Sequence, residues 1–163
     1  LSTGPEMLLL IETLADLIRA GRSFDEICKA GQEYLSTTHL LFSLRSIRNL
    51  AQNGRVSKLA ASAIGILGIQ ILAAASGQGT IEPVDKCRGD KKTRSAMVQK
   101  MYDYGYHGGK VRISHAENPE AAVAIERALR ERYPLADIKT RLCGGLCSYY
   151  AERGGVIVAF ETA

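Results

Sequence analysis

Several residue types are scarce in this sequence of 163 residues. It has no tryptophan, aromatic residues make up 6% of the chain, and 21 basic residues against 17 acidic ones leave a net charge of only +4. Apart from a cluster between Arg88 and Arg94, the basic residues are scattered. A dedicated nucleic-acid binder usually combines a basic face with stacking aromatic side chains. The composition therefore argues against nucleic acid as the main partner.

Long apolar runs are also missing. The run over residues 64–75 contains about 12 residues, whereas a helix needs roughly 20 to cross a bilayer. The apolar stretch over residues 7–18 is interrupted by Glu12 and Asp16, as an amphipathic helix would be. The sequence therefore predicts no membrane span and no targeting segment, and we expect a cytoplasmic location.

The cysteines do not form a recognisable framework. Cys28, Cys87, Cys143 and Cys147 have no ladder spacing and lie in apolar or glycine-rich surroundings, which is typical of a reducing, intracellular compartment. Cys143 and Cys147 resemble half of a metal site, but no second pair and no histidine at ligand spacing follow. We expect no metal and no cofactor.

Length and composition indicate a globular chain. With 46% apolar and 23% charged residues, it is large enough for a core of its own and fits one domain, or one domain with a piece of a second. The sequence begins at Leu1 directly on a helix-entry pattern. We therefore expect that the front of a longer protein is missing.

Periodicity and turn signals give the expected elements. Ser2, Thr3 and Gly4 precede Pro5 and Glu6, a pattern typical of a hydroxyl-capped helix start, and the helix should end at Gly21. A capping-box pattern at residues 23–26 opens a second helix to about residue 35. Further helices are expected over residues 46–52, 57–67, 91–104 and 120–133, and strands over residues 37–44, 69–74, 80–87, 110–114, 137–142 and 155–161. The β-α-β-α-β order from 80 to 160 predicts an α/β fold.

The segment at residues 53–58 carries the clearest signal for a binding site. Gly54 permits a tight turn, Arg55 is charged at any working pH, and Ser57 can cap the following helix. An apolar run over residues 59–75 follows directly. A cation beside an apolar wall suits a ligand with an anionic head and an apolar body. The alternative is an ordinary loop that enters a core helix.

Six segments, in this order and spacing, resemble the DegV family of bacterial fatty-acid-binding proteins. They are Ser2-Thr3-Gly4 and the segments at residues 53–58, 68–72, 86–92, 113–122 and 144–150. The resemblance covers essentially the whole chain but only about the C-terminal three-fifths of a typical member. It implies a mixed or antiparallel sheet flanked by helices, with residues 1–36 as the helical remnant of an N-terminal α/β domain and residues 37–163 as the C-terminal α/β domain.

The family implies a carrier, not an enzyme. Its two domains hold one long-chain fatty acid in a tunnel between them, and some members present the acyl group to a separate fatty acid kinase. By resemblance, Ser2 would bond the fatty-acid carboxylate and the amide of Thr3 or Gly4 could assist, at a helix N-terminus that favours an anion. The region over residues 64–72, with Ile66 and Ile69, would line part of the tunnel.

Three further residues are candidates on the same basis. Arg55 could set the charge of the pocket mouth, or form a surface or interdomain salt bridge. Arg88 matches a family arginine near the carboxylate exit, or belongs to a solvated basic cluster. Tyr150 stands where family members usually carry a histidine; its hydroxyl can donate a hydrogen bond but cannot serve as a base near pH 7.

Two other functions stay open from the sequence. One is a small hydrolase or transferase that uses Cys147, His115 or Glu152, although a lone histidine such as His115 is more often structural. The other is an interaction module that docks an acidic partner through the basic cluster at residues 86–94. The Gly144-Gly145 and Gly154-Gly155 pairs are interpreted as tight turns, because they lack the context of a phosphate loop.

Overall fold

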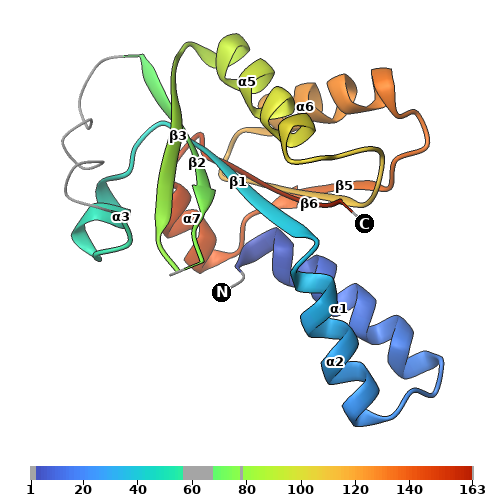
Figure 1. Cartoon of the computed structure of the whole chain (residues 1–163). Helices are drawn as coiled ribbons and strands as arrows, with labels where there is room; N and C mark the ends of the chain where they lie inside the picture. The colour runs from blue at the N-terminus through green and yellow to red at the C-terminus, as the bar shows by residue number, and fades with distance from the viewer. Residues whose placement is uncertain (1–2, 57–67, 78, 163) are drawn as a thin grey trace.

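A mixed β-sheet forms the centre of the molecule (Figure 1). The computed structural model describes residues 3–56, 68–77 and 79–162. In this part of the chain the sheet has six strands in the order β3-β2-β1-β6-β4-β5, and every neighbouring pair is antiparallel except the parallel pair β4 and β5. The strands are β1 (Thr38–Leu44), β2 (Ile69–Ala75), β3 (Ile81–Arg88), β4 (Val111–His115), β5 (Ile138–Leu142) and β6 (Val156–Glu161). The predicted α/β fold and its strands are confirmed.

Helices cover both faces of the sheet. They are α1 (Gly4–Arg19), α2 (Phe24–Leu35), α3 (Arg48–Gln52), α5 (Asp90–Asp103), α6 (Pro119–Arg132) and α7 (Gly145–Ala151). The capping box is confirmed, since Ser23 Oγ accepts a bond from the Glu26 amide and the Glu26 carboxylate accepts one from the Ser23 amide. The predicted hydroxyl cap of α1 is not observed at Thr3. This residue holds the N-cap position, but its side chain forms no capping bond. Ser2 and the helix predicted over residues 57–67 lie outside the described residues.

The two faces of the sheet differ in how they are filled. On one face, α5 and α6 pack along the strands, and methionine and aliphatic side chains of these helices surround Phe160 of β6. The other face receives Leu9 from α1, Leu50 from α3 and Ala151 from α7. Leu9 shares an apolar cluster with β1, so α1 packs against the sheet, while the hairpin of α1 and α2 extends away from it (Figure 1). The domain boundary at residue 36 stays a prediction.

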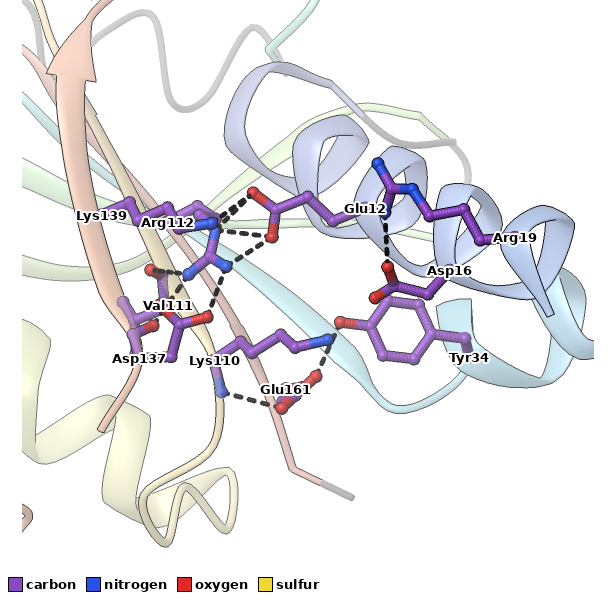
Figure 2. A network of polar contacts seen from close by, with 10 residues as sticks. All are labelled: Glu12, Asp16, Arg19, Tyr34, Lys110, Val111, Arg112, Asp137, Lys139 and Glu161. Carbon is purple, nitrogen blue, oxygen red and sulfur yellow. Dashed lines mark hydrogen bonds and ion pairs between the residues drawn. The ribbon is translucent and has the colours of Figure 1, made fainter. Parts of the chain in front are cut away.

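A buried arginine fixes α1 on the sheet (Figure 2). Arg112 lies on β4 with 1% of its surface exposed. Its guanidinium donates to both carboxylate oxygens of Glu12 on α1, to the Asp137 carboxylate at 2.7 Å, and to the carbonyls of Val111 and Asp137 at 2.9 and 2.8 Å. Lys139 Nζ adds a bond of 3.1 Å to Glu12. The buried cation is thus paired and fully hydrogen-bonded, as burial of charge requires.

A second polar group holds the end of β6 (Figure 2). The Glu161 carboxylate accepts bonds from the Tyr34 hydroxyl of α2 at 2.7 Å and from the Lys110 amide at 2.8 Å. Burial, together with the bond to Glu161, raises the pKa of Tyr34. Nearby, Thr38 Oγ1 of β1 donates to Glu6 of α1 at 2.8 Å. The bond between Thr38 and Glu6 ties the first turn of α1 to β1, and the bond between Tyr34 and Glu161 ties α2 to β6.

Replacing Glu12 by glutamine should lower the free energy of unfolding near neutral pH. The variant should also lose less stability than the parent when the pH is lowered. The pKa of Glu12 lies below the usual value of 4.5. The hydrogen bond from Arg112 is the largest cause of this shift, and burial opposes it. A carboxyl group with a lowered folded-state pKa stabilises the fold above its unfolded pKa, and this contribution is lost as the pH falls through the folded pKa. Urea titrations at several pH values would measure the free energy of unfolding.

The parent and the Glu12→Gln variant should differ most above about pH 4.5 and converge as the pH falls below it. Glu33→Gln is the matched control, because the Glu33 carboxylate forms an exposed ion pair with Lys29 at 3.9 Å. A Glu12→Gln difference that stays constant with pH would contradict the expectation.

Candidate functional site

An apolar cavity of about 270 Å³ lies on the face of the sheet that carries α3 and α7. Alternate residues of β1, namely Leu40, Phe42 and Leu44, form its floor together with Ile157 of β6. The side walls are formed by α3 and α7, with Leu50, Leu146, Cys147 and Ala151. Because successive strand residues point to opposite faces, these side chains all lie on one side of the sheet. In the described part of the chain, that side also carries one end of α1 and the short helices α3 and α7.

Polar side chains gather at one end of the cavity. Ser76 and Thr80 line it from the turn between β2 and β3, where their hydroxyl oxygens are 2.8 Å apart. Arg55 also lines it, and its carbonyl accepts a bond of 3.0 Å from the Ile81 amide at the start of β3. Gly54, with a φ of 66°, makes the turn that brings Arg55 there from α3. The cavity therefore has a cationic and hydroxyl-bearing end, while Leu44 lies towards the other end of β1.

Several of the predicted residues meet at this cavity. Thr3, Arg55 and Tyr150 all line it, although they come from three separate segments. Gly4 lies beside it: its φ is 50°, and a Cβ at this position would lie 3.1 Å from Sγ of Cys147, a lining residue. The structure therefore brings together half of the candidate set.

The remaining candidates lie elsewhere or outside the described residues. Ile69 and Arg88 are paired at the end of the β2–β3 hairpin opposite to its turn, and neither lines the cavity. Arg88 is exposed there and Ile69 is half-buried. Ser2 and Ile66 lie outside the described residues, so their roles stay predictions.

The sequence interpretation missed α7. Gly144-Gly145 was interpreted as a tight turn, but Gly145 begins a helix of seven residues that forms one wall of the cavity. Glycine is a poor helix former and the segment is short, so local propensity gave no helix signal. The available signal was spacing, because the four lining residues at positions 146, 147, 150 and 151 repeat as one face of a helix does.

The residues of the enzyme alternative have structural partners. The Glu152 carboxylate accepts a bond from the Asn49 amide at 3.0 Å, and His115 is buried with Nδ1 accepting from the Asn118 amide at 3.2 Å. Neither lines the cavity, whereas Cys147 does. Neighbouring Cys143 is a free thiol whose pKa is raised by burial to about 11, which disfavours the nucleophilic thiolate.

A second hollow of about 300 Å³ adjoins the first and shares Leu40, Ala75 and Ser76 with it. Its lining is more polar and includes Glu6 and His39. The His39 ring stacks on Tyr104 at a centroid distance of 5.0 Å, and burial lowers the pKa of this histidine.

The described residues hold no group of three or more His, Cys, Asp or Glu side chains placed to bind a metal ion. No helix in the same part of the chain has the length and apolar character that crossing a membrane requires.

Comparison with known proteins gives consistent matches over the whole chain. The family model for uncharacterised proteins of the DegV family matches residues 2–162. A DegV domain-containing protein of Streptococcus pyogenes serotype M1 is 44% identical over 161 residues, which are 99% of this chain and 58% of that protein. The chain thus spans about three-fifths of the length of the curated relatives that it matches.

Two solved structures share the fold closely. A DegV family protein from Eubacterium eligens, loaded with heptadecanoic acid, is 48% identical with a TM-score of 0.95, covering 99% of this chain and 59% of that one. The Fatty Acid Kinase (Fak) B3 protein of Streptococcus pneumoniae, loaded with linoleic acid, is 40% identical with a TM-score of 0.95, covering 99% and 58%.

Replacing Gly155 by alanine should displace α7 and destabilise the protein by about 2 kcal/mol, because overpacked sites usually lose 1–3 kcal/mol. A Cβ on Gly155 would lie 2.3 Å from the carbonyl oxygen of Ala151, which is backbone and cannot rotate away. Gly145→Ala is the matched control, since a Cβ there meets nothing within 4 Å. Chemical denaturation would measure both variants, and equal stabilities would show that the predicted clash is absent.

Proposed function

Because this chain belongs to the DegV family, we propose that it is part of a carrier that binds a long-chain fatty acid. The observation that carries this proposal is the cavity itself, whose floor is apolar and whose one end holds Arg55 and two hydroxyl side chains. Such a lining matches an acyl chain with an anionic head group. The fatty acids bound to the two similar solved proteins support the same ligand class.

We place the carboxylate near Arg55, Thr3 and Tyr150, and the acyl chain along Leu40 and Phe42. The Arg55 guanidinium supplies a permanent positive charge, and the hydroxyls of Thr3 and Tyr150 can donate hydrogen bonds to a carboxylate. The proposed role of Ser2 as a further donor is consistent with its place next to Thr3 in the sequence.

The energetics suit passive binding. Each buried CH₂ contributes about 0.8 kcal/mol, so a chain of roughly 16 carbons gains on the order of 10 kcal/mol before costs. Ordering the ligand and losing its translational freedom removes several kcal/mol, which leaves binding of about micromolar strength or tighter. The head group then needs only to be oriented, and no chemistry by the protein is required.

We propose that the carrier can present its ligand to a separate fatty acid kinase, as the name of the Streptococcus pneumoniae relative suggests. By the family resemblance, Tyr150 would stand where a histidine is usual, and a phenol is not a base near neutral pH. If such a step needs a base, a group other than the Tyr150 side chain would therefore have to accept the proton.

We also propose that this sequence corresponds to the C-terminal three-fifths of its relatives, with residues 1–36 completing an N-terminal α/β domain. Met7 and Ile11 of α1 and Leu146 of α7 are exposed apolar side chains, and Leu146 lines the cavity. A covering domain would bury them and close the cavity. Four free cysteines support a reducing compartment, and we propose the cytoplasm.

Mass spectrometry of lipids released from the protein, after purification from bacterial cells and denaturation, tests the ligand class. We expect saturated or unsaturated long-chain fatty acids at a stoichiometry near one. Protein that neither carries nor takes up any acyl species would contradict the proposal.

Replacing Arg55 by alanine should weaken binding of palmitic acid by about tenfold but leave binding of hexadecanol unchanged. A hydrogen bond to a charged group contributes about 1.5–3 kcal/mol, and the low end applies because the Arg55 side chain is exposed. Titration calorimetry with the two ligands gives both affinities. Arg127→Ala on α6 is the control for loss of an exposed arginine, and equal losses for acid and alcohol would contradict the placement of the head group.

A further inference from the structure

A polar contact, here called the clasp, joins α3 to α7 across one side of the cavity. The clasp consists of Asn49, Asn53, Tyr149 and Glu152. Asn49 donates from its side-chain amide to the Tyr149 carbonyl at 2.7 Å, and its backbone amide donates to the Glu152 carboxylate at 3.0 Å. Asn53 donates to the Tyr149 hydroxyl at 3.2 Å and to the Asn49 carbonyl at 2.8 Å. Residues adjacent to the clasp, among them Leu50 and Tyr150, line the cavity.

Glu152 is held in a backbone conformation that non-glycine residues rarely adopt. Its φ is 53° and its ψ is 174°, and conformations of this kind cost on the order of 1–3 kcal/mol. The carboxylate thereby reaches the first turn of α3, where backbone amides lack partners inside the helix. The N-cap position of α3 is Ile47, whose side chain cannot accept a hydrogen bond. Ser46 Oγ accepts a bond from the Arg48 amide at 3.3 Å, and Glu152 adds from the end of α7 a cap for the Asn49 amide.

Glycine residues lie at both ends of α7, where they could act as hinges. Gly144 precedes it and Gly145 begins it, both with open space where a Cβ would lie, and Gly154, with a φ of 90°, follows shortly after its end. Its outer side is open to solvent at Tyr149, which is 46% exposed. Its inner side lines the cavity. On the described chain, inward packing and the clasp hold this helix in place.

We propose that the clasp keeps α7 closed against α3 and so sets the rate at which an acyl ligand leaves the cavity. This inference rests on the proposed function. Asn49 and Glu152 are positioning residues in this view, because they act through α7 and Leu50 and do not touch the ligand. Weakening the clasp should open the side of the cavity between α3 and α7 more often, and ligand should escape faster while the fold is retained.

Stopped-flow fluorescence with cis-parinaric acid as the ligand and excess phosphatidylcholine vesicles as the acceptor measures this rate. Tyr149→Phe removes only the bond from Asn53 and should raise the dissociation rate constant about twofold to threefold. Glu152→Ala removes the cap on α3 and should raise it about tenfold, as expected for loss of one or more hydrogen bonds, one of them to a charged group. Glu152→Gln keeps an acceptor oxygen and should restore a rate close to that of the parent.

Tyr102→Phe is the matched control, because Tyr102 lies on α5 across the sheet from the cavity. Circular dichroism and melting temperature identify variants that have lost the fold, and the mild Tyr149→Phe variant still decides the question if Glu152→Ala does not fold. If folded Tyr149→Phe and Glu152→Ala variants release the ligand at the parent rate, the proposed role of the clasp is overturned. A parent chain that takes up no cis-parinaric acid would overturn the proposed function, and this inference with it.

Discussion

Unequal covering of the two faces of the sheet is the constraint from which the cavity follows. The α5 and α6 helices, 14 residues each, fill one face with a continuous core. In the described part of the chain, the other face is covered by one end of α1 and by two short helices, α3 with five residues and α7 with seven. Among the described residues, these elements bury the apolar side chains of β1 but leave a hollow of about 270 Å³ beside them. The well-packed face supplies the stability that allows this hollow on the opposite one.

The position of α1 depends on charge as much as on apolar packing. Only Leu9 of α1 is a fully buried apolar residue, while Glu6 and Glu12 bond to β1 and β4 respectively. Because Arg112 is almost fully buried, displacement of Glu12 would be costly, since it would remove one of the two carboxylates that pair with this cation. The pair therefore fixes the helix in register and direction. That orientation places Thr3 at the cavity and Gly4 against Cys147.

Local signals in the sequence predicted most elements but not their assembly. The capping box at Ser23 and the turn between β2 and β3 are decided by neighbouring residues, and the structure confirms both. Arg112 was not singled out, because an arginine in a short strand gives no sign that two acids from distant elements will pair with it. The same limit applies to strand order, which depends on contacts between distant segments.

For the site, sequence reasoning gave residue types but not their distances. Arg55 was predicted from its turn and the apolar run after it, and it lines the cavity. Thr3 and Tyr150 entered only through resemblance, since nothing in their spacing relates them to Arg55. Arg88 was as plausible as Arg55 from its sequence context. The pairing of β3 with β2 separates them. Arg88 lies opposite Ile69, at the end of the hairpin away from its turn, whereas Ile81, whose amide donates to the Arg55 carbonyl, lies at the turn end.

A carrier of this kind has to reconcile affinity with release. Apolar burial along β1 is non-directional and grows with every CH₂, by about 0.8 kcal/mol, so affinity is readily obtained. The same burial makes escape along the length of the cavity slow, because each CH₂ must return to water. Opening a side wall exposes the chain along its whole length at once and needs only a few hydrogen bonds to break. Polar contacts between α3 and α7 suit this task, since water can replace them at little net cost when they open.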